Sequence, residues 1–128
     1  MNPKESRRQF RRIAVGQEHT VRFRLLGHEF QRLPITNLSA SGCFVLLSGA
    51  LADRIREGLL LMDFVFEHED LPKTPVCAQI VRVVPSLPQV TENDLGVGLY
   101  FLSTSRQFLE WVDAYVSAYY DFPAAIAG

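Results

Sequence analysis

The sequence has little of the material from which disulfide frameworks, metal centres and membrane spans are built. It contains only two cysteines, Cys43 and Cys77, and each lies inside an apolar stretch without CxxC or Cys/His spacing. We therefore expect two small buried hydrophobic side chains rather than a disulfide or a pair of metal ligands. The longest apolar runs, such as residues 44–47 and 59–62, are far too short to cross a bilayer.

The N-terminus also lacks the apolar segment of a secretory signal, because Lys4 leads directly into a cluster of arginines. The sequence therefore predicts a cytoplasmic protein with no membrane partner. His19, His28 and His68 are dispersed, with no Ser, Cys or Asp at a recognised catalytic spacing. We expect each to be a surface or turn residue, and we expect no catalytic site, no metal site, no cofactor and no enzymatic activity.

What the sequence does have is enough apolar material for the core of one globular domain. Of its 128 residues, 48% are hydrophobic and 21% are charged. The net charge is only -1, but residues 1–33 have a balance of +5 and residues 34–128 a balance of -6. A short basic region on an acidic body favours a small anionic ligand, because proteins that bind long nucleic acid usually carry a broad basic face.

Strand patterns fill the middle of the chain. Residues 13–15 begin the core, and residues 21–25 alternate apolar and cationic side chains with period two, which is typical of a half-buried strand. A turn at Gly27-His28 and a returning strand follow, in which Pro34 indicates an edge or a bulge. The six strands that we expect are residues 21–25, 29–37, 42–47, 59–67, 76–84 and 95–101.

The C-terminal region has the pattern of an amphipathic helix. Apolar side chains recur at intervals of three and four after Phe108, and Ser103, Thr104 and Ser105 are candidate N-caps. Thr104 with Gln107 fits a capping box. We therefore predict a mainly β single domain over 1–122: a ligand-binding arm (1–12), a six-stranded antiparallel barrel (13–102), a helix (104–120), and a tail (123–128).

Two motifs carry the functional signal. The first is an arginine-rich arm, Arg-Arg-x-Phe-x-Arg-Ile over residues 7–13, and the second is Asn-x-Ser-x-x-Gly at Asn37, Ser39 and Gly42. Together, in this order, they resemble the paired signature of the PilZ domain family, and the Gly-Val-Gly-Leu-x-Phe stretch ending at Phe101 resembles the last barrel strand of that family. The resemblance covers residues 5–119. It implies a six-stranded barrel that binds the bacterial second messenger cyclic di-GMP, as a monomer or as an intercalated dimer.

The arginines suit such a ligand chemically. An arginine fork matches both the phosphate oxygens and the O6/N7 edge of guanine, and its planar head can stack on a purine. In the family pattern Arg8 and Arg12 are the paired motif arginines, whereas Arg11 occupies a variable position and is a possible further contact. An arginine just before the pair, as Arg7 is here, often accompanies binding of the intercalated dimer.

The second motif offers short polar groups. Asn37 can read a guanine edge, Ser39 can donate its hydroxyl to a phosphate or guanine, and Gly42 would allow a left-handed turn and a close approach of the backbone to the ligand. Ser41 and Arg82 are further candidates. Arg82 either lines the ligand side of the barrel or is an edge charge that prevents strand pairing.

If the arm lacks order without ligand, its ordering becomes a switch that passes the signal to an unidentified downstream protein. Motility, exopolysaccharide synthesis and secretion are all outputs of the family, and the chain looks like a stand-alone adaptor. One alternative is a ligand-independent adaptor; another is a small nucleic-acid-binding barrel, against which the charge distribution argues. A homodimer through the helix also stays open. The adaptor would use the aromatic residues of the helix and tail: Trp111, Tyr115, Tyr119, Tyr120 and Phe122.

Overall fold

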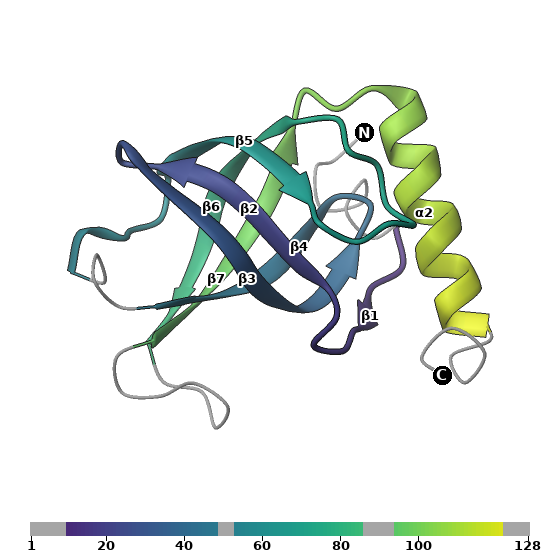
Figure 1. Cartoon of the computed structure of the whole chain (residues 1–128), viewed down its shortest axis with the longest axis horizontal. Helices are drawn as coiled ribbons and strands as arrows, with labels where there is room; N and C mark the ends of the chain where they lie inside the picture. The colour runs from purple at the N-terminus through teal and green to yellow at the C-terminus, as the bar shows by residue number, and fades with distance from the viewer. Residues whose placement is uncertain (1–9, 49–52, 86–93, 122–128) are drawn as a thin grey trace.

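The computed structural model describes residues 10–48, 53–85 and 94–121, which form a β-barrel with a helix at one end (Figure 1). The barrel is built from antiparallel strands, of which β2 with β3 and β3 with β4 are joined by tight turns. The elements are β1 (Ile13–Ala14), β2 (Thr20–Leu25), β3 (His28–Ser39), β4 (Gly42–Ser48), β5 (Leu60–Phe66), β6 (Val76–Val84), β7 (Asp94–Leu102) and α2 (Arg106–Asp121).

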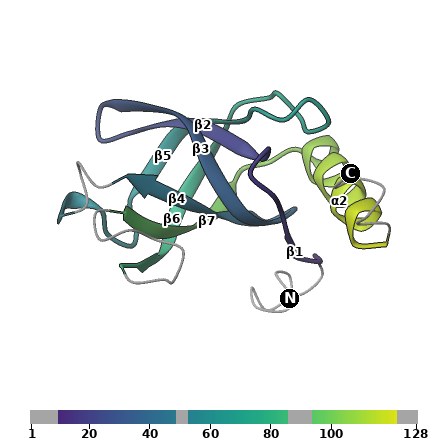
Figure 2. The ribbon, with the colours of Figure 1, turned by 60° about the horizontal axis from the view of Figure 1, so that its bottom comes forward.

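Six of the strands close into a ring. Their order is β3-β2-β5-β6-β7-β4, every pair is antiparallel, and the pairing of β4 with β3 completes the barrel. The prediction of a six-stranded antiparallel barrel with a C-terminal helix is therefore confirmed. The short strand β1 is an addition that lies beside β3, at the end of the barrel that faces α2 (Figure 2).

The long strand β3 serves two neighbours in succession. Its first part pairs with β2 up to Pro34, and its second part pairs with β4 from Ile35 onward. Pro34 lies where the partner changes, so its missing N–H falls between two ladders rather than within one. An edge or a bulge was expected at this proline; β3 instead changes partner here, and its register with β4 shifts just afterwards, between Ile35 and Asn37.

Two local expectations were wrong by one residue. The β2–β3 turn is formed by Leu26 and Gly27, with φ of 53° and 78°, and His28 already belongs to β3. Positive φ at both central residues is the geometry that a two-residue hairpin requires. At the helix, the N–H of Phe108 donates to the hydroxyl of Ser105 over 3.0 Å, so Ser105 rather than Thr104 is the N-cap.

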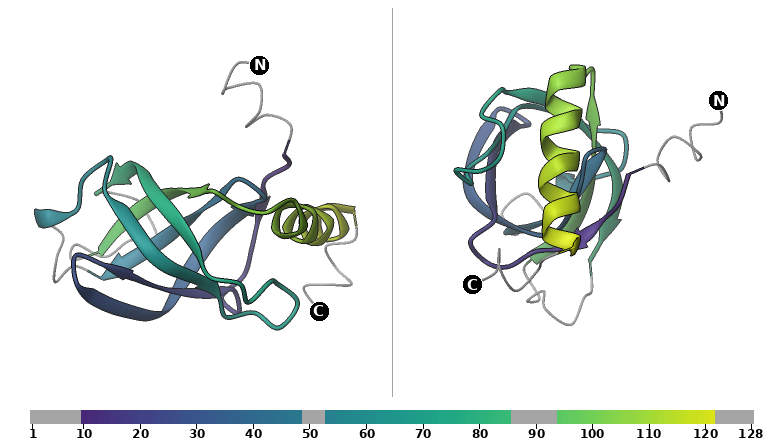
Figure 3. Two further views of the ribbon diagram at one scale, coloured as in Figure 1. Left: turned by 90° about the horizontal axis from the view of Figure 1, so that it is seen from above. Right: turned by 90° about the vertical axis from the view of Figure 1, so that its right-hand side faces the viewer.

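The helix covers one opening of the barrel. Figure 3 shows α2 crossing the ring of strands, and its inward face is anchored by Phe108, whose ring contacts those of Phe66 and Phe101. Val112, Val116 and Tyr119 are also buried. The apolar face of the helix is therefore used on its own barrel, where its burial contributes to stability. Within the described segments, no helix has the length and apolar character that crossing a membrane requires.

The cysteines and histidines depart in part from expectation. Cys43 is buried, whereas Cys77 is only partly buried and its Sγ lies 3.1 Å from the Sδ of Met62. His19 is not a surface residue: it is 1% exposed, its ring stacks on His68 at 4.5 Å, and its Nε2 lies 2.6 Å from the Tyr115 hydroxyl. The expectation failed because the partners of His19 come from a distant loop and from the helix.

Candidate ligand-binding site

The second motif forms the hairpin between β3 and β4. Asn37 lies within β3 opposite Phe44, and Ser39 ends the strand opposite Gly42. The Ser39 hydroxyl accepts a hydrogen bond from the N–H of Ser41 over 3.2 Å and lies 3.0 Å from the Ser41 hydroxyl oxygen. Because Ser39 is only 1% exposed, its visible role is to close the turn.

Gly42 is required for a different reason from the one that the sequence suggested. Its φ is not in the left-handed region, so the expected left-handed turn is absent. A Cβ atom on Gly42 would instead lie 2.0 Å from the carbonyl oxygen of Leu99 in β7. The glycine lets the β4 and β7 backbones approach at the point where the motif enters the barrel.

Asn37 carries an unsatisfied acceptor. Its Oδ1 atom is buried and has no hydrogen-bond partner, although the residue as a whole is only partly buried. A buried carbonyl oxygen without a donor is costly, typically by about 1–3 kcal/mol. The motif therefore contains an acceptor for which an arriving N–H donor would be favourable.

Strand β1 brings the end of the arginine arm to this hairpin. Ile13 pairs with Leu38 and Ala14 with Asn37, so Arg12, which precedes them, lies at the level of Ser39. The Cys43 thiol senses this position of Arg12. Burial raises the pKa of the thiol, and the nearby positive charge of Arg12 acts to lower it. Arg11 and Arg12 are both exposed, whereas Arg7 and Arg8 lie outside the described residues.

Arg82 lies on the same outer face as Asn37. The strand registers pair Asn37 with Phe44, Phe44 with Gly98, and Gly98 with Arg82, and directly paired residues share a face of the sheet. A Cβ on Gly98 would lie 3.1 Å from the Cβ of Arg82, so the glycine leaves room for the arginine. Because β6 is paired on both sides, Arg82 is not a charge on an edge strand, which was the second of the two roles expected for it.

Tyr100 was not among the residues that the sequence predicted for the site. It pairs with Gly42 on one side and with Gln79 on the other, which places a partly buried aromatic ring on the outer face beside the hairpin. The period-two pattern of β7 pointed to it, because Gly98 and Tyr100 alternate with the buried residues of the strand. An aromatic ring on the same outer face as Arg82 is a surface on which a planar base could stack.

A hollow of about 510 Å³ adjoins the hairpin along β3. It lies between the segment that follows β1 and the outer face of β3 and β4, and it contains one cation, Arg32. Its lining residues are Val15, Gly16, Gln17, Thr20, Arg32, Pro34, Ile35, Thr36 and Leu46. Among the described residues there is no group of three His, Cys, Asp or Glu side chains that could hold a metal ion.

Comparison with known proteins agrees with this geometry. The family model described as "PilZ domain" matches residues 6–118. The structure of the PilZ domain with c-di-GMP of YcgR from Escherichia coli has a TM-score of 0.68 and 17% identity, and the alignment covers 95% of this chain and 99% of that chain.

Two longer proteins share the fold. The Bacillus subtilis inhibitor of motility MotI/DgrA has a TM-score of 0.67 and 20% identity over 90% of this chain, and the K. pneumonia MrkH-c-di-GMP complex has a TM-score of 0.74 and 11% identity over 91%. The alignments cover 54% of each of those chains, so this chain spans about half their length. No curated protein matches the sequence. Since the family model covers most of the sequence, the chain belongs to the PilZ domain family.

Proposed function

We propose that this protein is a cyclic di-GMP receptor whose site combines the arginine arm with the β3–β4 hairpin. The observation that carries the proposal is the β1–β3 register, in which Ala14 pairs with Asn37 and Ile13 with Leu38, so that Arg12 follows on towards the hairpin that holds the buried acceptor of Asn37. The likeness to a PilZ domain with c-di-GMP supports the choice of ligand.

The chemistry of the ligand fits these groups. Cyclic di-GMP presents two phosphates and two guanines, and the forks of Arg8 and Arg12 provide charge-assisted bidentate contacts to phosphate or to the guanine O6/N7 edge. The amide of Asn37 reads the guanine edge, and its Oδ1 gains a donor from the ligand or from the arm. Ser39 and Gly42 hold the hairpin in shape, with Ser41 as a further contact. Arg82 extends the cationic surface along the same outer face.

We further propose that ligand binding orders residues 7–12 over the hairpin. Four arginines within six residues repel one another, and the two phosphates supply the opposite charge that allows them to gather. The surface of arm plus ligand would then be recognised by a downstream protein. In this proposal Arg7 sets the stoichiometry, so Arg7→Ala should change binding from two ligand molecules per chain to one.

Titration calorimetry tests the proposal. Purified protein is titrated with cyclic di-GMP, with GTP and with a short single-stranded oligonucleotide at two salt concentrations. We expect saturable binding of cyclic di-GMP alone. A steep salt dependence with the oligonucleotide, together with no heat from cyclic di-GMP, would replace the proposal with a nucleic-acid-binding barrel.

A further inference from the structure

A second surface lies on the side of the barrel away from the hairpin. In the ring of six strands, β5 is three strands from β4 in either direction. Five large hydrophobic side chains are exposed among the described residues, and three of them, Leu26, Leu60 and Met62, line one hollow of about 340 Å³. Their exposed fractions are 37%, 53% and 52%. Gathered apolar side chains of this kind mark interaction surfaces more often than scattered ones do.

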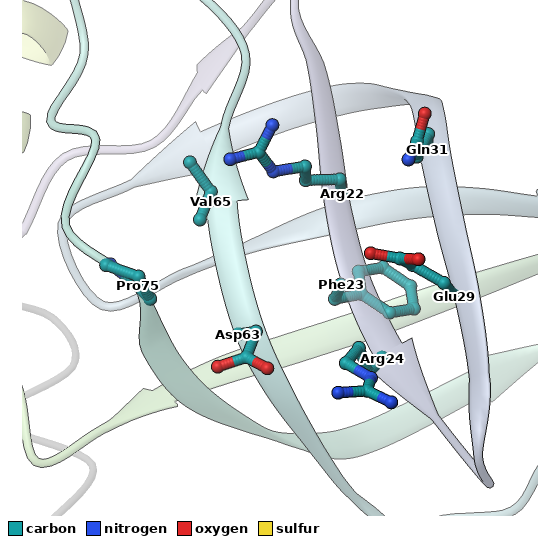
Figure 4. A pocket seen from close by; sticks show the side chains of 8 residues that line it. All are labelled: Arg22, Phe23, Arg24, Glu29, Gln31, Asp63, Val65 and Pro75. Atoms are coloured by element: carbon teal, nitrogen blue, oxygen red, sulfur yellow. The ribbon is translucent and has the colours of Figure 1, made fainter.

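Charged side chains continue this surface along β2, β3 and β5. A second hollow of about 260 Å³ shares Arg24 and Asp63 with the first (Figure 4). Its other charged residues are Arg22 and Glu29, so two cations and two carboxylates lie on one face. Within the described part of the chain, no salt bridge joins either arginine to Asp63 or Glu29. These charges are therefore available to a partner.

The backbone holds Asp63 outward in an unusual conformation. Arg22 pairs with Val65 and Arg24 with Met62, so β5 carries an extra residue at this point, and Asp63 has a φ of 55°. Such a bulge redirects a side chain, and positive φ in a residue other than glycine is often found where a surface is used. Asp63 therefore lines both hollows, as Arg24 does.

From this arrangement we propose that two copies of the chain associate through the outer face of β2 and β5 in a two-fold symmetric dimer. In a two-fold contact the same surface meets itself, so any charges on it are best matched when cations and carboxylates are equal in number, as the two arginines and two carboxylates of this face are. Arg24 of each copy faces the partner subunit's Asp63, and Leu60 and Met62 of both copies fill the centre. A nucleic acid or an anionic lipid surface would instead call for a net positive face.

Sedimentation at increasing protein concentration, without any nucleotide, is the first test. We expect the average mass to rise from that of one chain towards twice that value. Leu60→Glu places a charge at the centre of the contact and should weaken association by at least about a hundredfold. Ala118→Glu adds the same charge to the exposed side of α2 and should leave association unchanged.

A charge exchange tests the symmetry itself. Arg24→Glu and Asp63→Arg should each be monomeric alone, because each places like charges opposite one another. Mixed together they should form a heterodimer, because both contacts then join opposite charges. Arginine should tolerate this backbone conformation, since Arg32 already has a φ of 56° in the same barrel. Circular dichroism of each variant shows whether it is folded.

Three results would overturn the proposal: a single-chain mass at all concentrations, association that survives Leu60→Glu but is lost in Ala118→Glu, or no heterodimer from two folded charge-reversed variants. The second result would assign the contact to α2. These outcomes are independent of the nucleotide site. Cyclic di-GMP should bind Leu60→Glu as it binds the wild type, so a failure here and a failure of the receptor proposal are distinguishable.

Discussion

The two outer faces of the barrel differ in how closely their strands approach. Around the β3–β4 hairpin, Gly42 and Gly98 allow backbones and side chains to approach closely, and Asn37, Tyr100 and Arg82 lie on the same outer face. Across β2 and β5, exposed apolar and charged side chains, including Arg24 and Met62, project from the strands. A face that brings an amide, an aromatic ring and an arginine together suits a small ligand, whereas a face of exposed apolar and oppositely charged side chains suits another protein.

The largest expected effect tests whether the hairpin depends on the close approach of two backbones at Gly42. Gly42→Ala should lower the free energy of unfolding by about 3 kcal/mol or more, because the new methyl group would collide with the Leu99 carbonyl oxygen in β7. Urea denaturation measures the change. Gly27→Ala is the control: Gly27 has a φ of 78° and open space around it, so only about 1 kcal/mol of backbone strain is expected. Equal losses in the two variants would contradict the close-approach explanation.

The next effect concerns the arginines of the arm beside that hairpin. Arg8→Ala or Arg12→Ala should each weaken cyclic di-GMP binding by about ten- to a hundredfold, because a charge-assisted contact contributes about 1.5–3 kcal/mol. The thermal midpoint without ligand should not change. Arg106→Ala is the matched control, since Arg106 is exposed on α2 and, among the described residues, its ion pair is a 3.9 Å contact with Glu110. Arg11→Ala should be the mildest change in the arm. Calorimetry that gives one affinity for all four variants would remove the arm from the site.

A smaller effect is expected at the helix, which belongs to neither face. Ser105→Ala should cost about 1 kcal/mol of stability, because the N–H of Phe108 loses its acceptor. Thr104→Ala should cost less, and the comparison by thermal or urea unfolding decides between the two caps. A greater loss in Thr104→Ala would restore the capping box that the sequence suggested.

The last prediction concerns how the stability of the whole domain depends on pH through His19. Burial, followed by the nearby His68, lowers the pKa of His19 from 6.5, and Glu18 only partly opposes this. Because the unfolded chain then binds a proton more readily than the folded one, stability is complete above about pH 6.5 and is lost as the pH falls towards the lowered folded pKa. Unfolding should therefore become easier between pH 7 and 5. The slope should flatten in His19→Gln and persist in His28→Ala, whose histidine is exposed. A slope that is unchanged in His19→Gln would place the titration elsewhere.

Most elements of the barrel could be predicted because their signals are local. Period-two alternation in β2 and the three-four spacing in α2 come directly from which face of each element is buried. The position of the helix N-cap was misjudged by one residue, because each of the three neighbours from Ser103 to Ser105 has a hydroxyl that can cap a helix. The burial of His19 could not be predicted, because its contacts with His68 and Tyr115 join residues that are far apart in the chain.

For the proposed site, the sequence by itself predicted which residues carry the chemistry: the arginine arm and the motif from Asn37 to Gly42. Tertiary structure alone decided the pairing of β1 with β3, which brings Arg12 beside the motif, and it added Tyr100 of β7 as a candidate. It also gave Gly42 a packing role instead of a turn role. The physical reason is that side-chain type and period are encoded locally, whereas register and backbone approach depend on strands that close the barrel over long sequence distances.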